Sequence, residues 1–430
     1  MPGQCRQRPR NGPRPVPSPL YLDTARFGSI LPECAEMLRE FASLLESEGQ
    51  FPLFDEFLHH GSGSWPDRLT SRFPMLARWQ GIPSLRQQVF TLCGITTPAT
   101  VLFASASRHL ARVAFQMLSH RCERVLSSDA DWPEFQDMLR KQMVQSGGGL
   151  HTVKLEDPHF PDEDPYSREY RLAKAFRNQG CDAALITAVS AEGLTTRVER
   201  FLDEISNAAH PAYLVIDGSQ QAGHLPIELG SVFKGIYLAG THKWLRSGVP
   251  LSFGVIVHDG ESSDANLQIR KAIRLSQVDD SLLLQTANVG LKNPRQTTRL
   301  EPLVAASLAI EYALENRVQD MLEIRRCNAR HLFEIVTNLQ LELSVSVHHG
   351  IVELMLDGTD FTAHEIQRQF ADEGLTLSVC GDRRLRISCP ATEFTESEIS
   401  RLWRIFGRLA DRYCAIHNAA SDSDGCHSVA

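Results

Sequence analysis

The residues best suited to chemistry in this 430-residue chain lie between positions 212 and 257. Asp217 ends an apolar segment at 212–216, and Lys243 follows the next apolar segment, 235–239, after a short polar turn. If both segments are strands of one parallel sheet, the carboxylate and the amine converge beyond the same edge, where ligands bind in open α/β sheets. Such a lysine can form an imine with a carbonyl compound, and such an acid can keep a ring nitrogen protonated. On spacing alone, an ordinary Asp–Lys ion pair fits these two residues as well.

Alternating strands and helices are predicted around these two residues. Short apolar segments at 100–103, 183–189 and 253–258 have the composition of buried strands. Apolar residues at helical spacing follow the first segment over 110–118 and the second over 195–205. This alternation favours an α/β fold, in which a mostly parallel sheet is covered by helices.

From about residue 300 the pattern changes to two long helices, at 305–315 and 321–339, and short strands at 350–356 and 385–387. A smaller C-terminal α+β domain over 301–416 is therefore predicted beside a large domain over 20–300, with which chain length agrees. The helix predicted at 32–45 could pack with the small domain. Polar or proline-rich composition predicts disordered tails at 1–19 and 417–430.

Composition argues against several classes of function. A net charge of -8 and a pI near 6.1 leave no broad basic surface for nucleic acid or anionic membranes. No run of about 18 uncharged apolar residues predicts a membrane span. The ten cysteines are scattered, without a CxxC pair or metal-ligand spacing, which indicates reduced thiols and no metal site. A cytoplasmic protein with a small-molecule substrate is therefore predicted.

Two motifs carry a family resemblance. The run D-G-S-Q-Q-A-G-H-L-P-I-E-L from Asp217, followed by T-H-K-W-L from Thr241, resembles the class V aminotransferase family. That family includes cysteine desulfurases, kynureninases and isopenicillin N epimerase-like enzymes. The likeness extends from Tyr21-Leu22-Asp23 to Leu385-Arg386-Ile387-Ser388. It implies the large-domain sheet of fold type I enzymes, pyridoxal 5'-phosphate as cofactor, and a homodimer with shared active sites.

The resemblance also implies roles for the residues of the two motifs. Lys243 matches the lysine that holds the cofactor as a Schiff base, and Asp217 matches the acid that faces the pyridine nitrogen. Gln220 matches the residue that hydrogen-bonds the cofactor's phenolic oxygen. His242 and Thr241 match the pair that reaches the cofactor phosphate.

Further positions match the family outside these motifs. Ser105 and Ser107 lie where a polar loop meets the cofactor phosphate at a helix start, although simple helix capping would also explain them. Trp132 lies where an aromatic ring stacks on the cofactor, and a core tryptophan is the plain alternative. Thr297, in Gln296-Thr297-Thr298, matches a contact to the phosphate bound by the neighbouring subunit. Arg386 matches the arginine that binds the substrate α-carboxylate, unless it is an exposed edge-strand residue.

The reaction is less specified than the cofactor. The family's asparagine near position 190 is replaced by Ser190-Ala191-Glu192, and Cys380 stands only six residues before Arg386, closer than the mobile thiol of cysteine desulfurases. The run Q-T-T-R-L-E-P-L-V-A-A-S-L-A-I-E-Y looks most like the epimerase-like branch. Transaminase or epimerase-like chemistry on an amino acid or amine is therefore expected. The alternatives are a C–S lyase or cysteine desulfurase, and a non-catalytic relative that acts as a binding module.

Overall fold

The computed structural model describes residues 19–48, 54–155, 167–206, 211–230, 234–258, 262–287, 299–339, 344–356 and 362–424. The predicted contact of Thr297 lies outside these residues, as does the N-terminal segment 1–18. Among the described helices, none combines the length and the apolar character that crossing a bilayer requires.

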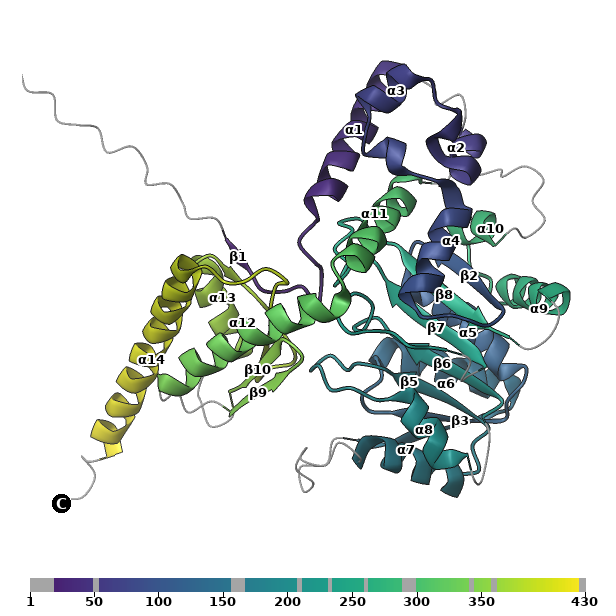
Figure 1. Ribbon diagram of the computed structural model, residues 1–430. Coiled ribbons are helices and arrows are strands. Elements are labelled where there is room, and N and C mark those ends of the chain that lie inside the picture. Colours follow the sequence, from purple (N-terminus) through teal and green to yellow (C-terminus); the bar gives the residue numbers. More distant parts are fainter. Residues whose placement is uncertain are drawn as a thin grey trace, which may run out of the picture.

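A seven-stranded sheet forms the centre of the larger unit (Figure 1). Its order is β2-β8-β7-β6-β5-β3-β4. The strand β8 runs antiparallel to both of its neighbours, and the remaining neighbours pair in parallel, which confirms the predicted mostly parallel sheet. The strands span Ala99–Ala104 (β2), Arg124–Ser128 (β3), Gly149–Val153 (β4), Ala183–Thr187 (β5), Tyr213–Asp217 (β6), Gly235–Gly240 (β7) and Ser252–Val257 (β8).

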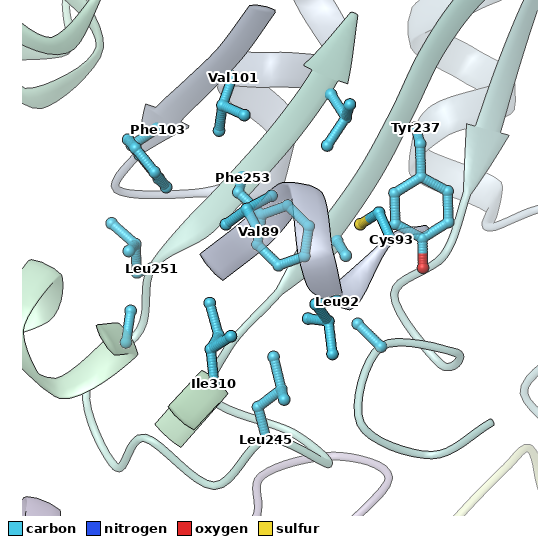
Figure 2. Packing of buried hydrophobic residues seen from close by; sticks show 14 of the residues in the cluster. Val89, Leu92, Cys93, Val101, Phe103, Tyr237, Leu245, Leu251, Phe253 and Ile310 are labelled. Atoms are coloured by element: carbon cyan, nitrogen blue, oxygen red, sulfur yellow. The ribbon is translucent and has the colours of Figure 1, made fainter. Parts of the chain in front are cut away.

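Helices cover both faces of this sheet because its central strands are apolar on both sides. In the central strand β6, Leu214 and Ile216 belong to one core cluster and Tyr213 and Val215 to another, as strand alternation requires. The first cluster includes α4 (Gly81–Leu92) and α11 (Glu301–Glu315), whose side chains meet those of the sheet in Figure 2. The second cluster includes α5 (Ser107–Ser119), α6 (Pro133–Ser146) and α9 (Ser262–Leu275).

The remaining helices of the larger unit pack around this core. Side chains of α7 (Ser167–Asn178) and α8 (Val198–Ile205) belong to the first cluster. The helix α8 begins three residues later than predicted, because the chain turns back after Val189 and Thr195 forms an antiparallel β-bridge with that residue. The short α10 (Ser281–Thr286) follows α9, and α2 (Phe54–His60) and α3 (Asp67–Arg72) lie near α1 (Pro32–Glu48).

The first helix packs with the larger unit. The sequence suggested that it could join the small domain, but Cys34, Met37 and Leu44 of α1 belong to the same core cluster as α11. The α11 side chains also lie in that cluster, so the helix that follows the predicted boundary at 300 packs on the large sheet. The boundary itself stays a prediction.

A four-stranded antiparallel sheet forms the smaller unit, in the order β12-β13-β10-β9, and α12 runs to it from the larger unit (Figure 1). The strand β1 (Leu20–Tyr21) pairs with β11 (Leu375–Thr376), so the first described strand lies on this unit. The other elements are α12 (Val318–Asn338), β9 (Ser344–His348), β10 (Ile351–Met355), α13 (Ala363–Asp372), β12 (Ser378–Val379), β13 (Arg384–Ser388) and α14 (Glu396–Asp424).

The C-terminal helix is longer than expected. A disordered tail was predicted from residue 417, but α14 continues to Asp424. Alanines at 415, 419 and 420 have high helix propensity, which favours this continuation. Residues 425–430 lie outside the described chain.

Candidate active site

One edge of the large sheet gathers the predicted site residues. Asp217 ends β6, and β7 beside it ends at Gly240, three residues before Lys243. The β2 strand ends at this same edge, because Ala104 and Gly240 both pair with Ser252 of β8. The convergence that the spacing predicted is therefore present in the fold.

Lys243 is half-buried as a residue, and no described residue forms a hydrogen bond or ion pair with its amine. Burial lowers the pKa of Lys243, the Asp217 carboxylate acts in the opposite direction, and the Arg386 guanidinium lowers the pKa further. Asp217 at the end of β6 and Arg386 of the small sheet are thus the two charged groups that act on this amine. A lowered pKa increases the fraction of neutral amine, which is the nucleophilic form.

Asp217 is buried and held in place by its own turn. Its side chain is only 6% exposed, and its Oδ1 accepts a hydrogen bond of 2.9 Å from the Ser219 amide. The next residue must be small, because a Cβ at Gly218 would lie 2.1 Å from the ring of Tyr237. The turn after β6 thus fixes the Asp217 carboxylate at the sheet edge. Among the described contacts, this carboxylate forms no ion pair with Lys243.

Gln220 has an amide whose orientation can be assigned from its partners. The Trp244 Nε1, which can only donate, donates to Gln220 Oε1 at 2.8 Å, and Gln220 Nε2 donates to the Ala25 carbonyl oxygen at 2.9 Å. Swapping the amide nitrogen and oxygen would break both bonds. One amide hydrogen remains, so Gln220 offers a donor, which is the group that a phenolate oxygen would accept.

The two residues before Lys243 differ in how far their polar side-chain atoms are available to a ligand. His242 is half-buried, and its Nδ1 is enclosed without a partner among the described residues. Burial, reinforced by Lys243, lowers the pKa of His242 to about 4, so the ring is neutral at pH 7. Thr241 is fully buried, and its hydroxyl lies 2.9 Å from the Ser247 hydroxyl and donates to the Leu251 carbonyl at 3.2 Å. The structure therefore places Thr241 inside the loop, and only His242 offers a polar atom in need of a partner.

Ser105 and Ser107 lie at the start of α5, but neither caps it, because Ala106 occupies the N-cap. Both donors of Ser105 are taken by Asp280: the amide donates at 2.9 Å and the hydroxyl at 2.8 Å to Asp280 Oδ2. His109 Nδ1 lies 2.6 Å from the same oxygen. Asp280 thus anchors the loop before α5, and sequence reasoning missed it. The half-buried Ser107, on the first turn, is better placed than Ser105 to meet an anion.

Trp132 lies at the N-cap of α6, directly after the strand-end turn of β3, and its side chain is 56% exposed. The alternative of a core tryptophan is therefore wrong. An indole of this exposure at the sheet edge leaves a flat apolar face for a ring to cover.

Arg386 is buried rather than exposed, which excludes the edge-strand alternative. Its side chain is 7% exposed; Nη1 donates to the Ala191 carbonyl at 3.2 Å, and Nη2 donates to the Ser378 hydroxyl at 3.3 Å. Asp23 Oδ1 lies 3.9 Å from Nη2 and also accepts from the Ser378 hydroxyl. Sequence reasoning assigned no role to Asp23 or Ser378, although the Tyr21-Leu22-Asp23 likeness pointed to the first.

His224, Trp244 and Arg325 form a stack of three side chains, of which Trp244 directly follows Lys243 in the sequence. The His224 ring lies 3.8 Å from the Trp244 ring at an interplanar angle of 9°, and the Arg325 guanidinium lies 5.0 Å from the Trp244 ring centre. Arg325 comes from α12 and donates to the Gly223 carbonyl at 3.1 Å. Sequence reasoning missed this contact between the two units, because it depends on residues far apart in the chain.

Trp244→Phe is expected to destabilise the protein by about 1–3 kcal/mol, because Gln220 Oε1 would lose its donor while it stays buried. Urea unfolding followed by far-UV circular dichroism measures this difference. Trp403→Phe, at a partly exposed position of α14, is the matched control and should leave the free energy of unfolding unchanged. Equal stability of the two variants would show that the indole bond contributes nothing.

The donor set of the site fits a polar, anionic ligand. The Lys243 amine, the enclosed Nδ1 of His242 and the enclosed Nε of Arg386 have no hydrogen-bond partners among the described residues. Buried polar atoms normally have partners, so the two enclosed nitrogens of His242 and Arg386, together with the Lys243 amine, indicate a place for a ligand with several acceptors. Pyridoxal 5'-phosphate with a substrate carboxylate meets this requirement.

Comparisons with known proteins agree on the fold. Cysteine desulfurase CsdA from Escherichia coli is similar with a TM-score of 0.68, over 92% of this chain and 95% of that chain, at 14% identity. Ureidoglycine-glyoxylate aminotransferase from Bacillus subtilis is similar with a TM-score of 0.61, over 93% and 95%, at 11% identity. The cystine C–S lyase C-DES gives a TM-score of 0.60, over 92% and 98%, at 14% identity.

A variant of C-DES was solved with glycine covalently linked to its PLP cofactor. In comparisons of sequence, no family model and no curated protein matches this chain. At these identities, the likeness concerns the fold. The chain therefore has the fold of these desulfurases, lyases and glyoxylate aminotransferases, which is the fold type I architecture that the motifs at Asp217 and Lys243 predicted.

Proposed function

We propose that this chain is a pyridoxal 5'-phosphate-dependent enzyme that acts on an amino acid or amine, with transaminase-like or epimerase-like chemistry. The observation that carries the proposal is the meeting of three groups at one sheet edge: the unpaired amine of Lys243, the buried carboxylate of Asp217 and the guanidinium of Arg386. An ordinary Asp–Lys ion pair would not explain why the amine lacks a partner or why an arginine lies beside it.

A reduction experiment tests this proposal. The purified protein, incubated with pyridoxal 5'-phosphate, is expected to show a visible absorption band that borohydride removes. Peptide mass spectrometry of the reduced protein should then locate one cofactor on Lys243. The absence of an adduct, or its location on another lysine, contradicts the proposal. The absence of an adduct would favour a binding module that only keeps the fold.

Each residue of the site has a proposed role in binding or in proton transfer. Pyridoxal phosphate, when bound, supplies an aldehyde for amines and a protonated ring that accepts electron density from a breaking bond. Asp217 holds the proton on the ring nitrogen, and the free amide hydrogen of Gln220 faces the phenolic oxygen. His242 and Ser107 are placed to bind the phosphate, with Ser105 as its braced neighbour. The Lys243 amine takes a proton from the substrate's α-carbon and can return it.

Arg386 is expected to bind the substrate carboxylate through its planar fork. Arg386→Lys keeps the charge but loses the fork, so KM should rise about tenfold or more, with a smaller change in kcat. A screen of amino acids for release of keto acid or sulfide first identifies a substrate. Steady-state kinetics with that substrate then measure KM and kcat. Arg383→Lys, at an exposed position of the preceding turn, should behave as wild type. An unchanged KM in Arg386→Lys would remove Arg386 from substrate binding.

The second candidate is a C–S lyase or cysteine desulfurase. It is favoured by one observation: the half-buried Cys380 lies close enough to Arg386 for that guanidinium to oppose the rise in its pKa. Burial nevertheless raises the pKa of Cys380, and a protonated thiol is a poor nucleophile. We therefore expect Cys380→Ser to keep wild-type turnover of amino acids. Sulfide release that disappears in this variant would favour a desulfurase, whereas sulfide release that persists would favour a lyase.

The assembly is also inferred. A homodimer, in which Thr297 contacts the phosphate of the neighbouring subunit, follows from the family resemblance, and sedimentation of the purified protein measures it. A cytoplasmic location is inferred from the cysteines, which are widely scattered along the sequence without a CxxC pair.

A further inference from the structure

A second carboxylate lies buried behind the candidate site. Asp131 is only 2% exposed and occupies the turn between β3 and α6. Three donors point at it: Oδ2 accepts from the Ser127 hydroxyl at 2.9 Å and from the Ser128 amide at 2.7 Å, and Oδ1 accepts from the Thr187 hydroxyl at 2.7 Å. None of the described residues forms an ion pair with it. Asp131 therefore belongs to a satisfied hydrogen-bond network rather than to a salt bridge.

This network connects the turn to the strand beside Asp217. Thr187 ends β5 and is the cross-strand partner of Asp217 in β6. Asp217 also raises the pKa of Asp131, although burial is the larger cause and the three donors counteract it. Asp131 thus joins the ends of two strands, β3 and β5, next to the residue that faces the predicted ring.

Trp132 follows Asp131 directly, and the surrounding backbone is fixed. The Phe135 amide donates to the Trp132 carbonyl at 2.9 Å, and the Gln136 amide donates to the same oxygen at 3.1 Å. Despite this fixed backbone, the indole is 56% exposed. The backbone of Trp132 is therefore fixed, while its large aromatic ring is left uncovered. Such a ring can stack on a flat ligand.

An aspartate that only stabilises a turn would need neither the burial of Asp131 nor its bond to β5, as another aspartate of the same turn shows. Asp129, two residues earlier, is exposed and accepts one hydrogen bond, from the Leu155 amide at 2.8 Å. None of its described hydrogen bonds reaches β5. Asp129 therefore provides an internal comparison of the same residue type on the same turn.

We propose that Asp131 is a positioning residue of the candidate site: through its bonds to Ser128 and Thr187, it holds the Trp132 indole where the ring of the coenzyme is covered. This inference rests on the proposed function, because it presumes that pyridoxal phosphate binds at Lys243. Asp131 itself touches neither coenzyme nor substrate. The proposed effect on binding is exerted through Trp132.

A double-mutant cycle on coenzyme affinity tests this dependence. The dissociation constant of pyridoxal 5'-phosphate is measured by absorption titration for wild type, Asp131→Asn, Trp132→Ala and the double variant. Each single variant should bind about three- to tenfold more weakly, the range of one aromatic contact. The double variant should bind no more weakly than Trp132→Ala alone, because the proposed effect of Asp131 is exerted through the indole. Losses that add, or an unchanged affinity in Asp131→Asn, would overturn the proposal.

A second readout reports on the ring itself, independent of turnover. The visible circular dichroism of bound coenzyme depends on how the ring is held, so its amplitude should fall in Asp131→Asn and stay as in wild type in Asp129→Asn. If Asp131→Asn does not fold, Thr187→Val removes one of the three bonds and Thr187→Ser keeps the hydroxyl. The valine variant should weaken binding and the serine variant should restore it; equal affinities for both would also overturn the proposal.

Failure of this inference and failure of the proposed function give different results. If wild type forms no adduct at Lys243, the coenzyme assignment is wrong and both proposals fall. If wild type forms the adduct but Asp131→Asn has wild-type affinity and dichroism, only the role of Asp131 is rejected.

Discussion

Lys243→Ala is expected to abolish covalent attachment of pyridoxal phosphate and to lower turnover by at least about 10³-fold, because the variant lacks both the nucleophile and the group that carries the proton. The physical reason lies in the environment of the amine. The amine has no partner among the described residues, and its pKa is lowered chiefly by burial.

Two measurements check this result. Intact-mass analysis after borohydride reduction should show the added cofactor in wild type and none in Lys243→Ala. Lys271→Ala, at an exposed position of α9, is the matched control and should retain both the adduct and the activity. A Lys243→Ala protein that still carries a reducible covalent cofactor would contradict the assignment of the Schiff-base lysine.

The sheet could be predicted from the sequence because its strands are apolar on both faces. All residues of β5, β6, β7 and β8 are buried, and such continuous apolar segments stand out between polar turns. The strand β3 was missed, since its segment R-V-L-S-S has only two apolar residues. Its two serines are buried in the Asp131 network, a role that composition does not reveal.

The site was predictable only where its residues lie within the two motifs. Lys243, Asp217 and Gln220 occupy strand ends, so their position follows from the sheet. The partners of these residues come from distant segments: Ala25 accepts from Gln220, and the Gly28 amide donates to the His242 carbonyl at 2.8 Å. Contacts of this kind depend on the tertiary fold, and no local pattern specifies them.

The N-terminal segment after β1 shows how the two units contribute to one site. Asp23 lies beside Arg386 of the small sheet, and Gly28 lies against the Lys243 loop of the large unit. A Cβ at Gly28 would lie 2.0 Å from the Lys243 carbonyl oxygen, so the close approach requires glycine. A short segment of chain therefore sets the distance between the proposed carboxylate-binding arginine and the proposed nucleophile.

Asp217→Asn is expected to lower turnover by about 10²-fold or more while Lys243 still binds the cofactor covalently, because a neutral amide cannot hold the ring nitrogen protonated. Asp137→Asn, at an exposed ion pair of α6, should have wild-type turnover. Wild-type turnover in Asp217→Asn would show that the ring charge is set by another group.

The same variant has a second effect, whose sign follows from the electrostatics of the site. In the cofactor-free protein, the Asp217 carboxylate raises the pKa of Lys243, against the dominant lowering by burial. Removing that charge lowers the pKa of Lys243 further, so the neutral amine should appear at lower pH than in wild type. The rate of reductive methylation of Lys243, followed by peptide mass spectrometry across pH, should rise earlier in Asp217→Asn. A shift to higher pH would mean that Asp217 does not act on this amine. Because the measurement needs neither cofactor nor substrate, it tests the geometry of the site separately from its catalytic function.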